Sequence, residues 1–241
     1  MKKLVFALAL ATGLAGAVQA DEQLDRRTWK WSPVGLGLAA PLQIPWVESD
    51  IYGLRFGGFF GYEHDVYGLD LGVAEVTAGD FVGLQASALS WSQGDAWGAQ
   101  FAALANVAEG SAIGLQVAPV NVAWTESLGV ELGLINRTVG YQGVQVAGII
   151  NWNTTESAGL ELSLINANQE GYFGYALGAL VNYAIRFNGC QLGFVNCAND
   201  VTGIQIGVFN ACDTLHGVQL GFLNLICDSE LPLMVIANAA F

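Results

Sequence analysis

Apolar and polar residues alternate in short segments that restart at a regular interval. Each segment begins at a glycine, and these glycines stand 14–16 residues apart, at positions 53, 68, 83, 98, 114, 129, 143, 159, 174, 189, 203 and 217. Counted from that glycine as position 0, positions +1 and +3 are apolar, and position +2 is polar in eleven of twelve copies. A period of two residues predicts a β-strand with one buried face, so we expect the +1 and +3 side chains to form the core.

An asparagine recurs toward the end of each later segment, usually at position +7. If equivalent residues of successive repeats stack, their side-chain amides can bond to one another in a ladder, which explains a polar residue on an inward row. The predicted ladder consists of Asn106, Asn121, Asn136, Asn151, Asn166, Asn182, Asn196, Asn210, Asn224 and Asn238.

The repeat predicts an all-β fold, most simply a β-solenoid of about 12–13 coils of 14–16 residues. All coils of a solenoid run in the same direction, so like residues lie about 4.8 Å apart. The alternative is a transmembrane β-barrel with antiparallel neighbours. The terminal Phe241 and the spacing of Trp91, Trp124 and Trp152 fit a barrel. Because the repeat length barely varies and the connections do not alternate in length, we favour the solenoid.

In this interpretation the +2 row forms a second ladder on the outer surface, beside small residues at +4. That flat strand face is the candidate interaction face, with Gln116, Gln145, Gln191, Gln205 and Gln219. The aliphatic +6 row either extends the outer face or turns inward at a bend before the asparagine, and the pattern leaves both open. It comprises Val120, Ile135, Ile165, Val195, Phe209 and Leu223.

The two ends of the chain differ from the repeats. Residues 1–20 combine Lys2 and Lys3, a short apolar run and a small-residue ending at Ala20, which predicts a cleaved signal peptide. Residues 21–50 are rich in proline and tryptophan and are expected to cap the array of residues 51–230. We expect residues 231–241 to form a degenerate last repeat or a C-terminal cap.

The Gly-Val-Gln-Leu-Gly-Phe-Leu-Asn unit at residues 217–224 resembles the surface-repeat proteins of spirochaetes and other bacteria with outer membranes. The resemblance covers residues 98–241 well and residues 52–97 loosely. It implies a location at the cell surface or in the envelope and implies no defined activity. Some members are lipoproteins, but the residue directly after Ala20 is Asp21 and not cysteine, so a lipid anchor is not carried over.

The formal net charge of −13 disfavours nucleic acid and anionic surfaces as partners. Acidic residues recur about once per repeat in the turns and predict a solvated negative edge that discourages aggregation. They are Asp65, Asp80, Asp95, Glu109, Glu126, Glu156, Asp200, Asp213 and Asp228.

Four cysteines lie in the last quarter of the chain: Cys190, Cys197, Cys212 and Cys227. Export permits disulfides, and four cysteines allow three pairings that the sequence does not distinguish. Their spacing matches no zinc signature, so buried thiols or a local disulfide are favoured over metal binding.

Residues for catalysis are scarce in this sequence. The histidines are His64 and His216, in different repeats, and no serine-nucleophile or phosphate-loop motif is present. Glu63-His64-Asp65 suggests a metal cluster, but no second histidine is nearby to complete a normal ligand set. We therefore predict no catalytic residue, no metal and no cofactor.

We predict a non-enzymatic exported protein of the cell surface or envelope, located at the outer membrane or in the periplasm, with a structural or adhesive role. Its partner is expected to be another protein or an envelope component. Membrane association and oligomeric state remain open. An outer-membrane β-barrel that forms a pore is the alternative.

Overall fold

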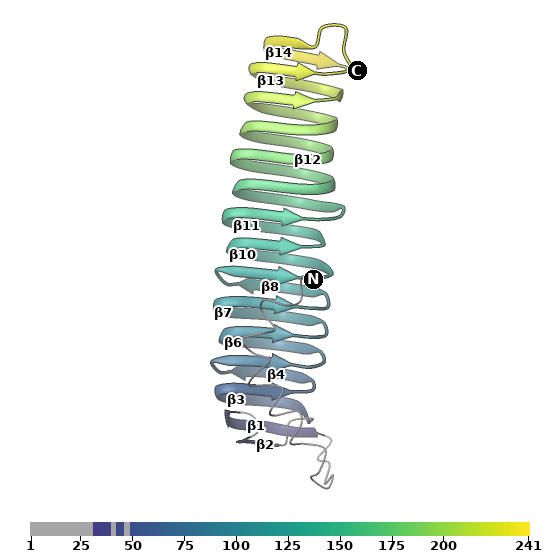
Figure 1. The fold of residues 1–241 in the computed structure, drawn as a ribbon. Helices are drawn as coiled ribbons and strands as arrows, with labels where there is room; N and C mark the ends of the chain where they lie inside the picture. The colour runs from purple at the N-terminus through teal and green to yellow at the C-terminus, as the bar shows by residue number, and fades with distance from the viewer. Residues whose placement is uncertain (1–30, 40–41, 46–48) are drawn as a thin grey trace, which may run out of the picture.

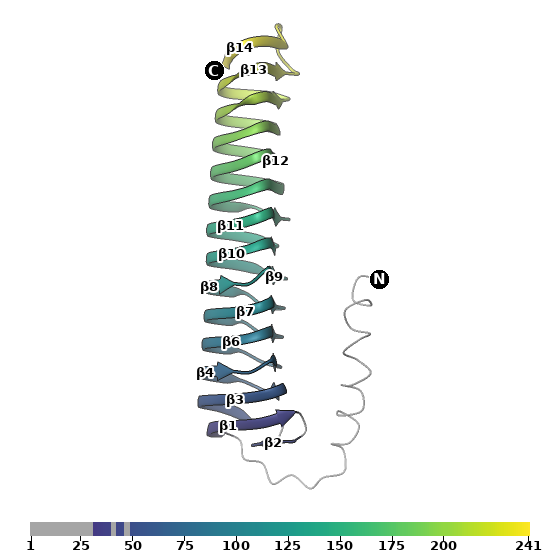
Figure 2. The same cartoon turned by 90° about the vertical axis from the view of Figure 1, so that its left-hand side faces the viewer.

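The protein is a straight rod of stacked β-coils (Figures 1 and 2). It is described by a computed structural model that covers residues 31–39, 42–45 and 49–241. The predicted signal peptide of residues 1–20 and part of the predicted cap of residues 21–50 lie outside these ranges. The described chain forms a β-solenoid of about 13 turns, as the repeat predicts.

The strands follow one another along the rod with short connections. The early strands are β1 (Trp31–Ala39), β2 (Leu42–Ile44), β3 (Asp50–Glu63), β4 (Val66–Leu71), β5 (Ala74–Thr77), β6 (Phe81–Ser92) and β7 (Ala96–Ala108). The later strands are β8 (Ala112–Val117), β9 (Val120–Ala123), β10 (Glu126–Thr138), β11 (Gly140–Asn153), β12 (Ser157–Cys212), β13 (Thr214–Ile226) and β14 (Leu233–Ala240). Strand β12 winds through several coils without interruption (Figure 1).

Successive coils pair in parallel and place like residues side by side. Gly129 lies beside Gly114 on one side and Gly143 on the other. The register shifts near position +4, for example between Gly133 and Ile135, which absorbs the variation in repeat length. Parallel pairing between coils is incompatible with the antiparallel barrel, so the barrel alternative is wrong.

The repeat glycine is required by the backbone. All twelve glycines at position 0 have φ between +126° and +149°, a region that L side chains rarely adopt. A Cβ atom on Gly159 would lie 2.0 Å from the carbonyl oxygen of Gly143 in the preceding coil. Both constraints recur in every coil, which explains why this glycine marks the repeat.

The structure reverses the predicted faces of the strand. The +2 residues point into the rod, and Gln85, Gln145, Gln205 and Gln219 are fully buried. The +1 and +3 residues point outward, and Leu54, Phe101, Leu192 and Ile206 count among the exposed large hydrophobic residues. The prediction of an apolar core at +1 and +3 with an outer glutamine ladder is therefore wrong.

A polar interior is stable here because each glutamine at +2 bonds to the +2 residue of a neighbouring coil. Gln100 Nε2 donates to Gln85 Oε1 at 2.9 Å, and Gln116 Nε2 donates to Gln100 Oε1 at 2.8 Å. Gln219 and Gln205 repeat this pattern near the C-terminal end. Buried amides that satisfy one another avoid the desolvation cost of an unpaired polar group.

The asparagine ladder is confirmed. From Asn106 to Asn210, each asparagine Nδ2 donates to the Oδ1 of the asparagine in the following coil at 2.8–3.0 Å, so the ladder ends at Asn224. Several also donate to a backbone carbonyl of that coil, as Asn196 does to Ile206 at 2.9 Å. Asn238 is the exception, because it lies opposite Gln219 in an antiparallel strand.

Apolar side chains occupy only part of the interior. They come from position −2, two residues before the glycine, and from the second residue after the ladder asparagine. Tyr172, Phe187, Val201 and Leu215 pack with Ala184, Ala198, Cys212 and Ile226 in the late coils. The core is thus apolar at one corner and built from amides at the other.

Both described ends are closed by antiparallel strands. At the C-terminal end, β14 folds back along β13, so residues 231–241 form a cap and not a further coil. At the N-terminal end, β1 pairs in parallel with β3 and antiparallel with β2. These strands cover edges that would otherwise offer unpaired backbone groups to other chains.

Candidate interaction surface

The outward rows form one continuous apolar surface, which we call the apolar face. It combines the +1 and +3 residues with the one to three residues that precede the ladder column in each coil, from Leu54 to Leu223. No residue in these rows is charged. Its most exposed members are Leu54, Phe56, Phe59, Val73, Leu84, Phe101, Leu104, Leu132, Leu134, Ile135, Ile149, Leu164, Tyr175, Leu180, Leu192, Phe194, Ile204, Ile206, Phe209, Leu220 and Phe222.

The +6 row belongs to this face. Ile135 and Phe209 are exposed, and Val120, Ile165, Val195 and Leu223 are half-buried, so none of the six turns fully into the core. Of the alternatives that the sequence leaves open, the outward one is correct. The apolar surface therefore continues around the corner before the asparagine column.

A shallow groove of about 580 Å³ runs along the apolar face. Its floor is formed by small +4 residues such as Gly178, Gly193 and Gly207, and its walls by +3 residues such as Leu192 and Ile206. Glycine is needed on this floor: a Cβ atom on Gly207 would lie 2.6 Å from Asn196 Nδ2. The asparagine ladder therefore leaves no room for a side chain at these +4 positions, and the surface is low there.

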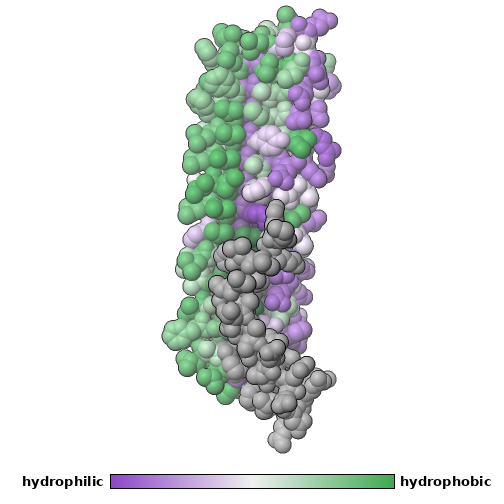
Figure 3. Space-filling model, in the orientation of Figure 1, coloured by the Kyte–Doolittle hydropathy of each residue, from purple (hydrophilic) through white to green (hydrophobic). Residues whose placement is uncertain are grey.

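Charged residues gather on the opposite edge of the rod. Figure 3 shows hydrophobic residues along one side and hydrophilic residues along the other. Asp65, Asp80 and Asp95 form an acidic column in the turns between strands, and each accepts the backbone N–H of the equivalent residue in the next coil at 2.7–2.9 Å. The predicted negative edge is therefore present in the early coils and helps to hold the turns together.

The described ranges contain three arginines and no lysine, and each arginine contacts an acidic or aromatic side chain. Arg55 is buried. Arg137 lies over the rings of Trp124 and Trp152, with its guanidinium carbon 4.8 Å and 5.8 Å from their centroids. Arg186 pairs with Glu156 at 2.8 Å.

The predicted glutamine interaction face does not exist. Gln116, Gln145, Gln191, Gln205 and Gln219 are at most 5% exposed, so they cannot contact a partner. The interaction surface that the fold offers consists of their neighbours at +1 and +3.

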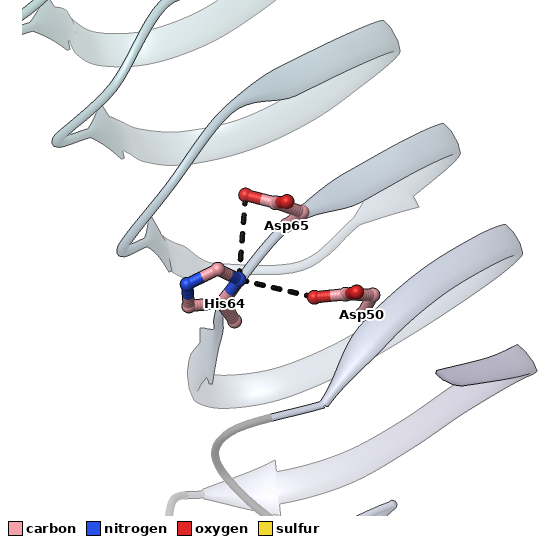
Figure 4. Close-up of side chains that lie close together, drawn as sticks. All are labelled: Asp50, His64 and Asp65. Carbon is pink, nitrogen blue, oxygen red and sulfur yellow. Dashed lines mark hydrogen bonds and ion pairs between the residues drawn. The ribbon is translucent and has the colours of Figure 1, made fainter. Parts of the chain in front are cut away.

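Residues 63–65 do not form the cluster that the sequence suggests, because Glu63 points inward. His64 lies instead between Asp50 and Asp65, with Nδ1 at 3.0 Å and 3.5 Å from their Oδ1 atoms (Figure 4). Asp65 Oδ1 already accepts the backbone N–H of Asp80 at 2.8 Å. The group is a solvated hydrogen-bond cluster of the turn edge. His216 lies elsewhere, within β13, where its Nδ1 contacts the carbonyl oxygen of Leu215.

The first coils enclose a buried charge cluster that the sequence analysis missed. Arg55 contacts Asp70 Oδ2 at 3.0 Å, Glu75 Oε2 at 2.8 Å and Glu63 Oε1 at 3.7 Å. Burial raises the pKa of Glu63 to about 8 and that of Glu75 to about 7, while Arg55 opposes both shifts. The signal was present, because Arg55 and Asp70 occupy the same +2 position as the later glutamines.

Two further carboxyl groups are buried without a cation beside them. Burial raises the pKa of Glu161 to about 8, although Asn153 and Asn168 donate to its oxygens at 2.6 Å and 3.0 Å. Burial likewise raises the pKa of Glu131, which accepts from Ser127 and Gln145. Both residues replace glutamine at +2 and interrupt the glutamine ladder.

The four cysteines are free thiols in this structure. Cys212 is buried and its sulfur accepts Gln219 Nε2 at 3.2 Å, whereas Cys227 is exposed. The disulfide alternative is thus not realised, and the buried-thiol interpretation fits Cys212.

Comparison with known protein families, with curated proteins and with solved structures found no match for this chain. Within the described ranges, no helix is long and apolar enough to cross a membrane. The functional argument therefore depends on the surface of the rod itself.

Proposed function

We propose that this chain is a non-enzymatic, exported protein of the bacterial cell envelope or surface, with a structural or adhesive role. The observation that carries the proposal is the apolar face, which extends along the coils and contains no charged residue. Monomeric soluble proteins rarely expose apolar patches larger than a few hundred Å². A rigid rod with such a face is suited to holding a partner along its length.

Export is supported by the sequence. The basic start, short apolar run and Ala20 ending are typical of a signal peptide. The repeat unit resembles those of bacterial surface-repeat proteins, which gives the same location. The protein is therefore expected at the surface, at the outer membrane or in the periplasm, bound to another protein or an envelope component.

The location is tested in the native bacterium. Fractionation followed by N-terminal sequencing is expected to recover the chain from the envelope fraction with Asp21 as its first residue. Recovery from the cytosol with Met1 still attached would overturn the proposal.

The role of the apolar face is tested with charge substitutions on it. Replacing Leu132 and Leu192, both exposed +3 residues, by lysine is expected to release the protein from the envelope fraction. The matched control is Ile185→Lys, which places the same charge on an exposed aliphatic residue of β12 outside the apolar face, next to Arg186. Equal retention of all three proteins would show that the apolar face does not mediate attachment.

A further inference from the structure

We propose that the apolar face is the interface of a symmetric homodimer, in which a second copy of this chain packs face to face along the rod. The inference rests on the proposed function, because it names a second copy of this chain as the partner of the same surface, so that retention in the envelope requires the dimer. It draws on the size of the face, its repeat spacing and the position of the charges.

The face has the size of a stable interface. From Gly53 to Gly217 the coils extend about 53 Å at the usual strand spacing, and the path from +1 to +6 is about 15 Å wide. The resulting area of about 800 Å² per copy matches the contribution of each partner to a standard protein–protein interface. A face of this area loses much unfavourable contact with water when it is covered.

The shape of the face suits a second copy. Its side chains stand in straight columns spaced by the strand repeat, and the groove above Gly178, Gly193 and Gly207 runs parallel to these columns. A two-fold axis presents the same columns and the same groove to each copy. Two stacked sheets pack about 10 Å apart with nearly aligned strands, so a column of one copy can enter the groove of the other along the rod.

The charge distribution favours the same partner. The acidic edge lies away from the apolar face (Figure 3), so two copies can associate without bringing carboxylates together. A membrane is less suitable, because anionic lipid repels a chain of net charge −13. Of the described arginines at the surface, the half-buried Arg137 contacts tryptophan rings and the exposed Arg186 pairs with Glu156. The uncharged apolar face of a second copy is therefore the partner that suits this face best.

The test is the mass of the purified exported protein in detergent-free solution, measured by sedimentation equilibrium from 0.1 to 100 μM. We expect the wild-type chain to form a dimer, and Leu132→Lys with Leu192→Lys to weaken dimerisation at least about 100-fold, because each copy would bury two charges without partners. Ile185→Lys should dimerise like the wild type. Unchanged β-sheet circular dichroism would show that the variants are folded.

Three results would overturn the homodimer. The first is a wild-type chain that remains monomeric at 100 μM, and the second is a double variant that dimerises as tightly as the wild type. The third is a monomer that floats with phosphatidylcholine vesicles through Leu132 and Leu192, which would make lipid the occupant. Each of these results leaves the envelope location untouched, because that location is measured separately by fractionation and N-terminal sequencing.

Discussion

The first and the last coils solve the same problem in different ways. In both, polar side chains at +2 and in the asparagine column point into a thin interior. The late coils fill these positions with amides, so Asn196 and Gln205 bond to identical residues in the neighbouring coils. The early coils place Arg55, Asp70 and Glu75 there instead. An amide both donates and accepts a hydrogen bond, so a ladder of amides can continue from coil to coil. The buried carboxyl groups depend instead on a single arginine.

The largest expected effect on stability comes from removing Arg55, the cation that the buried carboxyl groups of the early coils share. Arg55→Met would leave the carboxyl groups of Asp70, Glu75 and Glu63 buried without their cation, and the free energy of unfolding at pH 8 should fall by about 3–5 kcal/mol. The loss should be smaller at pH 5, where these groups can be protonated. Urea denaturation followed by circular dichroism measures both values.

Arg137→Met is the matched control, because Arg137 stacks on tryptophan rings and is only half-buried. It should cost less than about 1 kcal/mol. An Arg55 variant no less stable than this control would show that the charge cluster does not stabilise the early coils.

An interruption of the asparagine ladder should be the next largest effect. Asn196→Ala removes the bonds to Asn210 and to the carbonyl of Ile206, and it leaves the amide of Asn182 with only one of its two acceptors, the carbonyl of Leu192. We expect a loss of about 2–4 kcal/mol, since several buried polar groups lose their partners. Thermal and urea unfolding give the value, and the exposed Asn199→Ala serves as control.

The equivalent change in the early coils sharpens the comparison. Ser90 occupies the same column next to Asn106 and bonds only to Ser87. Ser90→Ala should therefore cost about 1 kcal/mol. A loss as large as that of Asn196→Ala would contradict the distinction between a continuous ladder and isolated polar contacts.

The third contrast between buried charges and amides is a pH dependence of stability with an unusual sign. Burial raises the pKa of Glu161 to about 8 in the folded protein, above its ordinary value of 4.5. The folded state therefore binds the proton more tightly, and its stabilising effect is complete below pH 4.5 and lost as the pH rises through about 8. The protein should be more stable at pH 5 than at pH 9.

Glu161→Gln should flatten this dependence, because glutamine stands at +2 in many other coils and carries no charge. We expect a gain in stability on the order of 2 kcal/mol at pH 9 and little change at pH 5. Denaturation curves at the two pH values for both proteins provide the comparison. A wild-type protein whose stability rises from pH 5 to pH 9 would contradict the assignment.

The sequence predicted the coils and the asparagine ladder because both depend on spacing. A glycine every 14–16 residues and an asparagine in phase with it leave few folds other than parallel stacking. The sequence failed on the direction of the strand faces, because the rule that apolar residues are buried assumes an apolar core. In this thin coil the +2 side chain is buried, and Gln205 is stable there because Gln191 and Gln219 bond to its amide.

The even-numbered positions of the repeat contained a signal for which face of the strand points inward. The glycine at 0, the polar residue at +2 and the small residue at +4 share one side of the strand, and small residues are needed where backbones and ladders crowd. The charge cluster could not be read in the same way. Glu63 and Glu75 lie outside the +2 row, and only the folded coils bring them to Arg55.

The central claim is that the amides are inside the rod and the aliphatic side chains outside. The most direct test is exchange of side-chain amide protons after transfer to D₂O, followed by NMR. We predict that Gln205 and Gln219, which are fully buried, retain their protons for hours, whereas the exposed Asn199 exchanges within minutes. Exchange of Gln205 and Gln219 as fast as that of Asn199 would place the glutamines on the surface and contradict the account.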